Sequence, residues 1–260
     1  MMAVTASPLP FMELPGQARR GTYLCGMTNQ IRVIAFDADD TLWVNEPYFQ
    51  ETEKAFCELL SSYAPEHTVA RELLQTEIKN LTLYGYGIKG YMLSMIETAL
   101  SISERTVDNR IIDKVIELGH HLLARPIELL DGVEEVLSTL KGQYRLVVAT
   151  KGDLLDQERK MKNSGVDHYF HHIEIMSEKG ENDYRKLIRH LDVRPEEFLM
   201  IGNSLKSDVL PVLKAGGHAI HVPYHTTWAH EVVDHHLEHA NFREAATIRD
   251  VLHLLAEKKS

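Results

Sequence analysis

Short apolar runs that alternate with helical patterns are the feature of this sequence that most restricts its fold. Five such runs can be read along the chain, at residues 31–36, 145–149, 172–176, 198–201 and 218–222. Apolar residues between them recur at helical spacing, as in residues 133–140. Strands that are apolar on both faces and alternate with helices are typical of a parallel sheet with helices on both sides. The sequence therefore predicts a doubly wound α/β fold.

One interval, residues 48–126, breaks this alternation. Four helical patterns follow one another there, and we find no convincing strand in the sequence between them. We expect a second, compact helical body inserted after the first strand. It would lie above the carboxyl ends of the strands, where open α/β sheets bind their ligands. Residues 1–26 contain three prolines and no sustained period, so we expect a flexible N-terminal extension.

The length, composition and net charge of the chain limit the classes of function that are open to it. The chain has 260 residues, of which 44% are hydrophobic, so it can bury the core of an enzyme-sized unit. Its formal net charge of −10 argues against a nucleic-acid partner, and no stretch approaches the roughly 20 apolar residues of a membrane span. Cys25 and Cys57 are the only cysteines, which favours a reducing compartment and predicts a cytoplasmic protein.

The first apolar run ends in FDADDT, which places three aspartates in four positions. If the strand continued, Asp37 and Asp39 would share one face, about 7 Å apart. Two charges at that distance repel by roughly 2–3 kcal/mol at an effective dielectric of 20. Such a pair is tolerated when one carboxyl keeps a proton or when a cation lies nearby. Acid–base catalysis, nucleophilic attack and metal binding are therefore open to these residues, whereas a solvated acidic turn is the plain alternative.

Polar residues also follow the later strands. Thr150 ends the second run, where its hydroxyl and the backbone N–H groups of Lys151 and Gly152 could hold an oxyanion. Lys179 follows the third run, and GNSLKSD, which contains Asp208, follows the fourth. Each signal is weak alone. Carboxylates, a hydroxyl, an amine and a further acid at consecutive strand ends together predict a catalytic site.

With these motifs the chain resembles the haloacid dehalogenase-like superfamily. The resemblance extends from about residue 31 to residue 257 and is carried by DADDT at 37–41, Thr150, Lys179 and GNSLKSD at 202–208. It implies a Rossmann-like catalytic core, here residues 27–47 and 127–260. It also implies a mobile helical cap domain, here residues 48–126.

The resemblance further implies a role for each motif residue. Asp37 would be the nucleophile that forms an aspartyl-phosphate, and Asp39 would act as general acid and then general base. Thr150, Lys151 and Lys179 would bind the phosphoryl oxygens. The implied cofactor is Mg²⁺, with four candidate ligand residues: Asp37, the backbone carbonyl of Asp39, Asn203 and Asp208.

Two positions depart from the family pattern. Asn203 stands where many relatives have a metal-associated aspartate, so we expect Mg²⁺ to bind more weakly while Asp208 keeps an anionic ligand available. Asp40 stands at a position where glycine is the commonest residue in the family. Aspartate tolerates left-handed backbone better than most residues, so the turn can be retained.

Residues 85–90, GYGIKG, match a dinucleotide-binding spacing but follow a helical pattern where that motif needs a strand. We interpret them as a loop between helices of the insertion. Its position above the strand ends makes Tyr86 and Lys89 candidates for substrate specificity.

The sequence favours a Mg²⁺-dependent phosphatase of small phosphorylated metabolites. A nucleoside monophosphate-specific nucleotidase and a phosphomutase remain open, because both would use the same motifs. A haloacid dehalogenase would need neither Asp39 nor Asp208. A non-catalytic phosphate-binding module is the remaining alternative. The oligomeric state cannot be read from the sequence.

Overall fold

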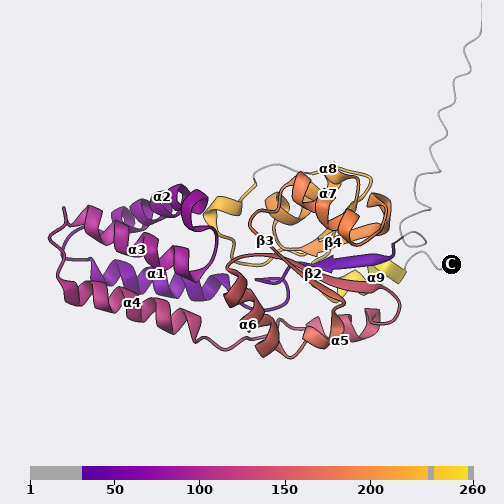
Figure 1. Cartoon of the computed structure of the whole chain (residues 1–260), viewed down its shortest axis with the longest axis horizontal. Helices are drawn as coiled ribbons and strands as arrows, with labels where there is room; N and C mark the ends of the chain where they lie inside the picture. Colours follow the sequence, from indigo (N-terminus) through magenta and orange to yellow (C-terminus); the bar gives the residue numbers. More distant parts are fainter. Residues whose placement is uncertain (1–30, 234–236, 257–260) are drawn as a thin grey trace, which may run out of the picture.

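A six-stranded parallel sheet forms the centre of the computed structural model, which describes residues 31–233 and 237–256 (Figure 1). The strand order is β3-β2-β1-β4-β5-β6. The strands are β1 (Val33–Phe36), β2 (Arg145–Lys151), β3 (His172–Met176), β4 (Phe198–Gly202), β5 (His218–His221) and β6 (Phe242–Glu244). The five expected strands are confirmed. The sixth was not expected, because three residues with two charges carry no strand pattern. The extension at residues 1–26 lies outside the described residues.

Residues of β1 alternate between two hydrophobic cores, one on each face of the sheet. Ile34 and Phe36 pack with buried residues of α5 (Val133–Leu140), α6 (Leu154–Ser164) and α9 (Asp250–Ala256). Val33 and Ala35 pack on the opposite face with α7 (Glu181–His190) and α8 (Leu210–Ala215). Figure 1 shows these two helical layers on either side of the sheet. The doubly wound α/β fold is therefore confirmed.

Four helices follow β1 and pack as a bundle beside the sheet (Figure 1). They are α1 (Glu46–Leu59), α2 (Glu66–Tyr84), α3 (Ile88–Ile102) and α4 (Asn109–Leu123). Phe56, Leu73, Met95 and Val115, one from each helix, are fully buried in a core of their own. None of the helices in the described ranges has the length and apolar character that a membrane span requires. The division into a core and a cap domain of residues 48–126 stays a prediction.

Short helical turns fill several connections: η1 (Asp167–Tyr169), η2 (Pro195–Glu197), η3 (Leu205–Val209) and η4 (Ala229–Glu231). Residues 85–87 of the GYGIKG segment form the loop between α2 and α3, whereas residues 88–90 begin α3, so the expected loop is shorter than predicted. Gly87 in this loop has φ of 109°, and a side chain there would approach the backbone of Asp153 at the start of α6. Glycine therefore permits this close contact between the bundle and the sheet layer.

Asp40 joins the strand end to the bundle. Its φ of 60° is the left-handed conformation expected at this position. Its carboxylate accepts hydrogen bonds from the backbone N–H groups of Asn45 (2.9 Å) and Glu46 (3.0 Å) at the start of α1. An aspartate therefore does at this turn what a glycine could not, because its side chain caps the first helix of the bundle.

Candidate active site

Side chains from four strand ends meet at one cavity of about 210 Å³. Asp37 follows β1, Thr150 lies in β2, Lys179 follows β3, and Asp208 follows β4. All four line the cavity and all are buried. Gly202 at the end of β4 permits this arrangement, because a side chain there would collide with the Asp208 carboxylate. The structure thus brings together the motif residues that the sequence placed at separate strand ends.

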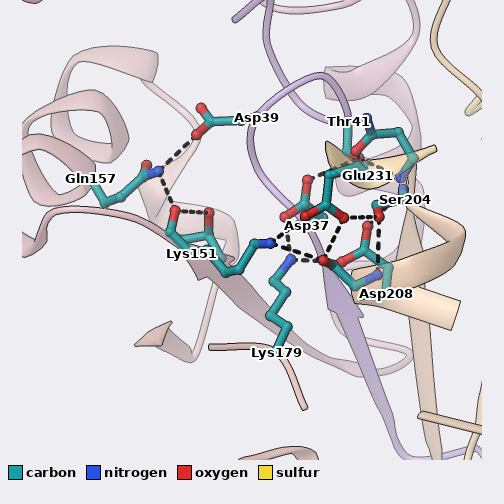
Figure 2. A network of polar contacts seen from close by, with 12 residues as sticks. Asp37, Asp39, Thr41, Lys151, Gln157, Lys179, Ser204, Asp208 and Glu231 are labelled. Carbon is teal, nitrogen blue, oxygen red and sulfur yellow. Dashed lines mark hydrogen bonds and ion pairs between the residues drawn. The ribbon is translucent and has the colours of Figure 1, made fainter. Parts of the chain in front are cut away.

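The Lys179 ammonium lies between two carboxylates (Figure 2). It donates to Asp37 Oδ1 and, at 2.7 Å, to Asp208 Oδ1. The other oxygen of Asp37 accepts a hydrogen bond from Thr41 Oγ1 at 3.3 Å. The cation that offsets the charge of the first aspartate is therefore a lysine from the end of β3.

This arrangement shifts the pKa of both partners. Burial raises the pKa of Asp37 to about 7; the Lys179 charge opposes this rise and the Asp208 charge adds to it. Burial opposes the charged form of Lys179, but Asp208 and Asp37 hold the pKa of its ammonium well above its usual range. Lys179 therefore stays positively charged, and it lies beside the Asp37 carboxyl, whose pKa is close to neutral pH.

The Asp39 carboxylate has a different set of hydrogen-bond partners from that of Asp37. Its carboxylate accepts hydrogen bonds from Trp43 Nε1 (2.7 Å), Gln157 Nε2 (2.8 Å) and Lys160 Nζ (2.9 Å). Burial alone would raise the pKa of Asp39, but the Lys160 charge and these hydrogen bonds lower it below its ordinary value. Asp39 is therefore an ionised carboxylate in this conformation. Figure 2 shows it directed toward Gln157, apart from the group around Asp37.

The expectation that Asp37 and Asp39 share one strand face was wrong. The strand ends at Phe36, and the chain turns immediately, with the Ala38 carbonyl accepting a hydrogen bond from Leu42 N at 2.8 Å. The two-residue alternation of a strand therefore does not extend to the aspartates. Each of the two meets a lysine of its own, and both still line the same cavity.

Asn203 faces the oxygens that could hold a metal ion. With its amide nitrogen turned toward them, it donates to Thr41 Oγ1 (3.2 Å), Asp37 Oδ2 (3.3 Å) and the Asp39 carbonyl (3.3 Å). In the other orientation of the amide its oxygen lies there and accepts a hydrogen bond from Thr41 Oγ1 at 3.2 Å. Oxygen atoms from a carboxylate, a backbone carbonyl and an amide are the donors that Mg²⁺ prefers, so these residues fit the ion.

Asp208 lies near this group, and its Oδ2 accepts from Ser204 N at 2.9 Å. Within residues 31–233 and 237–256, no cluster of three or more His, Cys, Asp or Glu side chains has the arrangement of a metal site. This is consistent with the expected ligand set, in which only Asp37 and Asp208 contribute side-chain carboxylates.

Lys151 takes part in a network that the sequence did not reveal. Its ammonium donates to Glu231 Oε1 (2.7 Å) and Ser207 Oγ (2.9 Å). The other oxygen of Glu231 accepts from Ser204 Oγ (2.5 Å) and Ser207 Oγ (2.6 Å). Although burial opposes it, Lys151 and the two serines lower the pKa of Glu231 to about 2. Glu231 therefore anchors the Lys151 side chain at the wall of the cavity.

The two candidates from residues 85–90 differ in position, because Tyr86 lies in the loop and Lys89 in the first turn of α3. Tyr86 lines the cavity, its hydroxyl donates to Glu178 at 3.0 Å, and the Lys151 ammonium lies 4.2 Å from its ring centre. Lys89 is not among the cavity-lining residues; it forms an ion pair with Asp153 at 2.9 Å and is half exposed. The structure thus brings Tyr86, and not Lys89, to the site.

Sequence reasoning missed Lys160, Gln157 and Glu231. Gln157 and Lys160 are three residues apart on α6, so they share one helix face, and both are buried. A polar pair on an inward helix face was the available signal for them. Glu231 is the last residue of η4, in a segment rich in polar residues where no local pattern distinguishes one carboxylate from another.

A family model for haloacid dehalogenase-like hydrolases matches residues 31–216. Among characterised proteins, N-acylneuraminate-9-phosphatase of Mus musculus is 26% identical over 205 residues, which cover 72% of this chain and 80% of that protein. Glyceraldehyde 3-phosphate phosphatase of Methanothermobacter thermautotrophicus is 24% identical over 200 residues, covering 73% of this chain and 84% of the relative.

A solved structure supports the same assignment. A haloacid dehalogenase-like family hydrolase from Xanthomonas campestris superposes with a TM-score of 0.78 at 37% identity. The match covers 88% of this chain and 93% of the other. It therefore includes the helical bundle as well as the sheet.

Proposed function

The chain belongs to the haloacid dehalogenase-like hydrolase family and is a phosphate monoester hydrolase, and we propose that it acts through an aspartyl-phosphate on Asp37 with bound Mg²⁺. The observation that carries the proposal is the buried group of Asp37, Lys179 and Asp208 at the wall of a cavity. Small phosphorylated metabolites are the proposed substrates, since both named relatives are phosphatases of such compounds.

In the first step an Asp37 oxygen attacks phosphorus, and the bond between phosphorus and the ester oxygen breaks. Protonated Asp39 gives its proton to the leaving oxygen. In the second step the Asp39 carboxylate takes a proton from water, whose oxygen attacks phosphorus. The bond to Asp37 then breaks, which releases inorganic phosphate and restores the carboxylate. Lys179 and Thr150 stabilise charge on the phosphoryl oxygens in both steps.

Asp39 must change partners to do this. Lys160 and Gln157 hold its carboxylate in the ionised form, so it must release them to protonate a leaving group. Mg²⁺ would be held by Asp37, the Asp39 carbonyl, Asn203 and Asp208, and would supply positive charge to the phosphoryl group.

A panel of phosphate esters, assayed for phosphate release with Mg²⁺ and with a chelator, tests the proposed function. We expect release from small sugar or alkyl phosphates that requires Mg²⁺. Stoichiometric transfer of phosphate to a second sugar, with none released, would indicate a phosphomutase. Activity that is unchanged by the chelator would contradict the metal requirement.

The amide of Asn203 gives a prediction for metal affinity. In the Asn203→Asp variant a carboxylate replaces the amide beside Asp37 and the Asp39 carbonyl. Because added anionic charge strengthens Mg²⁺ binding, we expect the Mg²⁺ concentration for half-maximal activity to fall by about ten-fold. The measurement is a Mg²⁺ titration of phosphate release. An unchanged or higher half-maximal concentration would remove Asn203 from the proposed ligand set.

Lys160 gives a prediction for the pH profile. The Lys160→Met variant loses the charge that does most to lower the pKa of Asp39, so that pKa rises. If Asp39 must be protonated to act as general acid, the alkaline limb of kcat/KM then moves to higher pH. The control is Lys162→Met, an exposed lysine of the same helix. Equal profiles for both variants would refute a role of Lys160 in setting the protonation of Asp39.

A further inference from the structure

Three glutamates line the part of the cavity that the helical bundle forms. Glu46 and Glu53 lie on α1, seven residues apart, so they are on one helix face about 10 Å from each other. Glu77 lies on α2. Asp40 fixes the first turn of α1 at the strand end, so Glu46 lies near the catalytic aspartates and Glu53 lies two turns farther into the bundle.

No cation among the described residues balances these glutamates within the cavity. The positively charged residues that line it are three lysines, Lys151, Lys160 and Lys179. None of the three lies on the helical bundle: Lys151 is in β2, Lys160 in α6, and Lys179 follows β3. Each forms an ion pair with Glu231 or an aspartate. The lysines of the cavity therefore lie near the strand ends, each paired with a carboxylate, whereas the charged residues that the bundle contributes are all acidic. We call this part of the cavity its acidic end.

No lining cation offsets the carboxyls of Glu46, Glu53 and Glu77 in the described part of the chain, and this affects their pKa values. Burial raises the pKa of Glu46 to about 8, and the charges of Asp40 and Glu53 add to this rise. Burial likewise raises the pKa of Glu77 to about 8, with further contributions from Glu53 and Glu46. Glu46 and Glu77 therefore favour their protonated, neutral forms near neutral pH, and a positive charge placed among the three carboxyls would favour their ionised forms.

Two unpaired polar atoms border the same region. The Tyr91 hydroxyl and Asn80 Oδ1 have no hydrogen-bond partner among the described residues, although the two residues are only 6% and 2% exposed. Both line the cavity, and the nearby charges that act on Tyr91 are those of Glu77, Glu53 and Glu46. Buried polar groups without partners are rare in folded proteins. Their presence here indicates a space built for a polar ligand.

The acidic end suits an organic cation better than a metal ion. Within the described residues no three carboxylates converge as metal ligands do. The rings of Phe49 and Tyr91 lie 5.1 Å apart and both border the cavity beside the glutamates. Aromatic rings next to carboxylates are the surroundings in which proteins bind ammonium groups.

We propose that the substrate is a phosphate monoester whose leaving alcohol carries an ammonium group, which Glu46, Glu53 and Glu77 bind while the phosphoryl group lies at Asp37. This inference rests on the proposed phosphatase function and adds the class of its substrate. An ester whose organic part carries a carboxylate is disfavoured by the same charges.

Matched pairs of esters test the proposal. We compare 2-aminoethyl phosphate with 2-hydroxyethyl phosphate, and 5-aminopentyl phosphate with 5-hydroxypentyl phosphate, by kcat/KM for phosphate release. The members of each pair differ only in the terminal group. We expect at least one amine to exceed its hydroxyl partner by about ten-fold or more, the ratio that one charge-assisted hydrogen bond supplies.

Isosteric variants assign that preference to the glutamates. Glu53→Gln and Glu77→Gln are each expected to reduce the amine-to-hydroxyl ratio by at least about five-fold, because each removes a carboxyl that can ionise beside the ammonium group. Since the ratio is measured on one preparation, loss of folded protein cancels. The control is Glu58→Gln, an exposed glutamate of α1 that does not line the cavity and should leave the ratio unchanged.

Two results would overturn the proposal while leaving the phosphatase function intact. One is hydrolysis of both members of each pair with equal efficiency, and the other is a preference for amines that Glu53→Gln and Glu77→Gln do not alter. If no ester is hydrolysed, the phosphatase function fails instead. Calorimetry of the same esters with the Asp37→Asn variant then decides the inference: tighter binding of the amines supports it, and equal binding overturns it.

Discussion

Asp37→Asn is expected to lower kcat by roughly 10⁴-fold or more, the range seen when an enzyme loses its nucleophile. An amide nitrogen or oxygen at this position cannot form the acyl-phosphate. The fold should remain, because Lys179 keeps its ion pair with Asp208 and the backbone N–H of residue 37 still donates to the Ile201 carbonyl at 2.9 Å. Phosphate release and urea unfolding, measured on the same preparation, separate the two effects.

The matched control is Asp167→Asn, which makes the same change at an exposed aspartate away from the cavity. It should retain full activity. If Asp37→Asn retained more than about a hundredth of the wild-type rate, the nucleophile would have to be another group. Deamidation of the new asparagine would restore activity slowly with storage, so the assay uses freshly prepared protein and its mass is checked.

Lys179→Met is the second change with a large expected effect. The methionine keeps most of the side-chain volume but leaves the buried carboxylates of Asp37 and Asp208 without the ammonium between them. Removing one partner of a buried ion pair costs about 3–5 kcal/mol. We therefore expect the free energy of unfolding in chelator to fall by that amount. We also expect kcat to fall by at least about 10³-fold, because a phosphoryl-binding charge is lost.

Added Mg²⁺ should restore more stability to this variant than to the wild type, since a divalent ion can replace the missing charge between the carboxylates. The control is Lys186→Met, an exposed lysine of α7 whose pair with Asp183 lies at the surface. It should change stability by less than about 1 kcal/mol. Equal losses for the two variants would mean that Lys179 contributes no more than a surface charge.

The sheet and the strand-end residues could be predicted because their signals are local. Apolar runs mark the strands, and parallel strands bring their carboxyl ends to one edge, so Asp37, Thr150, Lys179 and Asp208 could be grouped before their contacts were known. β6 gave no such signal. Its three residues pair with β5, and that pairing depends on the neighbouring strand and not on an apolar pattern of its own.

The contacts of Asp39 could not be predicted, because they depend on where the chain leaves the strand. Its partners Gln157 and Lys160 are more than a hundred residues away in sequence. Glu231 is likewise far from Lys151 in the sequence, 80 residues away, and only the folded chain brings the two together. The acidic end of the cavity combines α1 and α2, whose glutamates look like ordinary surface residues in the sequence.

In the proposed mechanism the Asp37 carboxylate becomes phosphorylated during turnover. Borohydride reduces an acyl-phosphate to an alcohol, which would convert this aspartate to homoserine. The measurement is peptide mass spectrometry of enzyme treated with borohydride during turnover of a hydrolysed ester. We expect homoserine at position 37 only when substrate and Mg²⁺ are both present. Homoserine at position 39 or 208, or unmodified Asp37 during steady phosphate release, would contradict it.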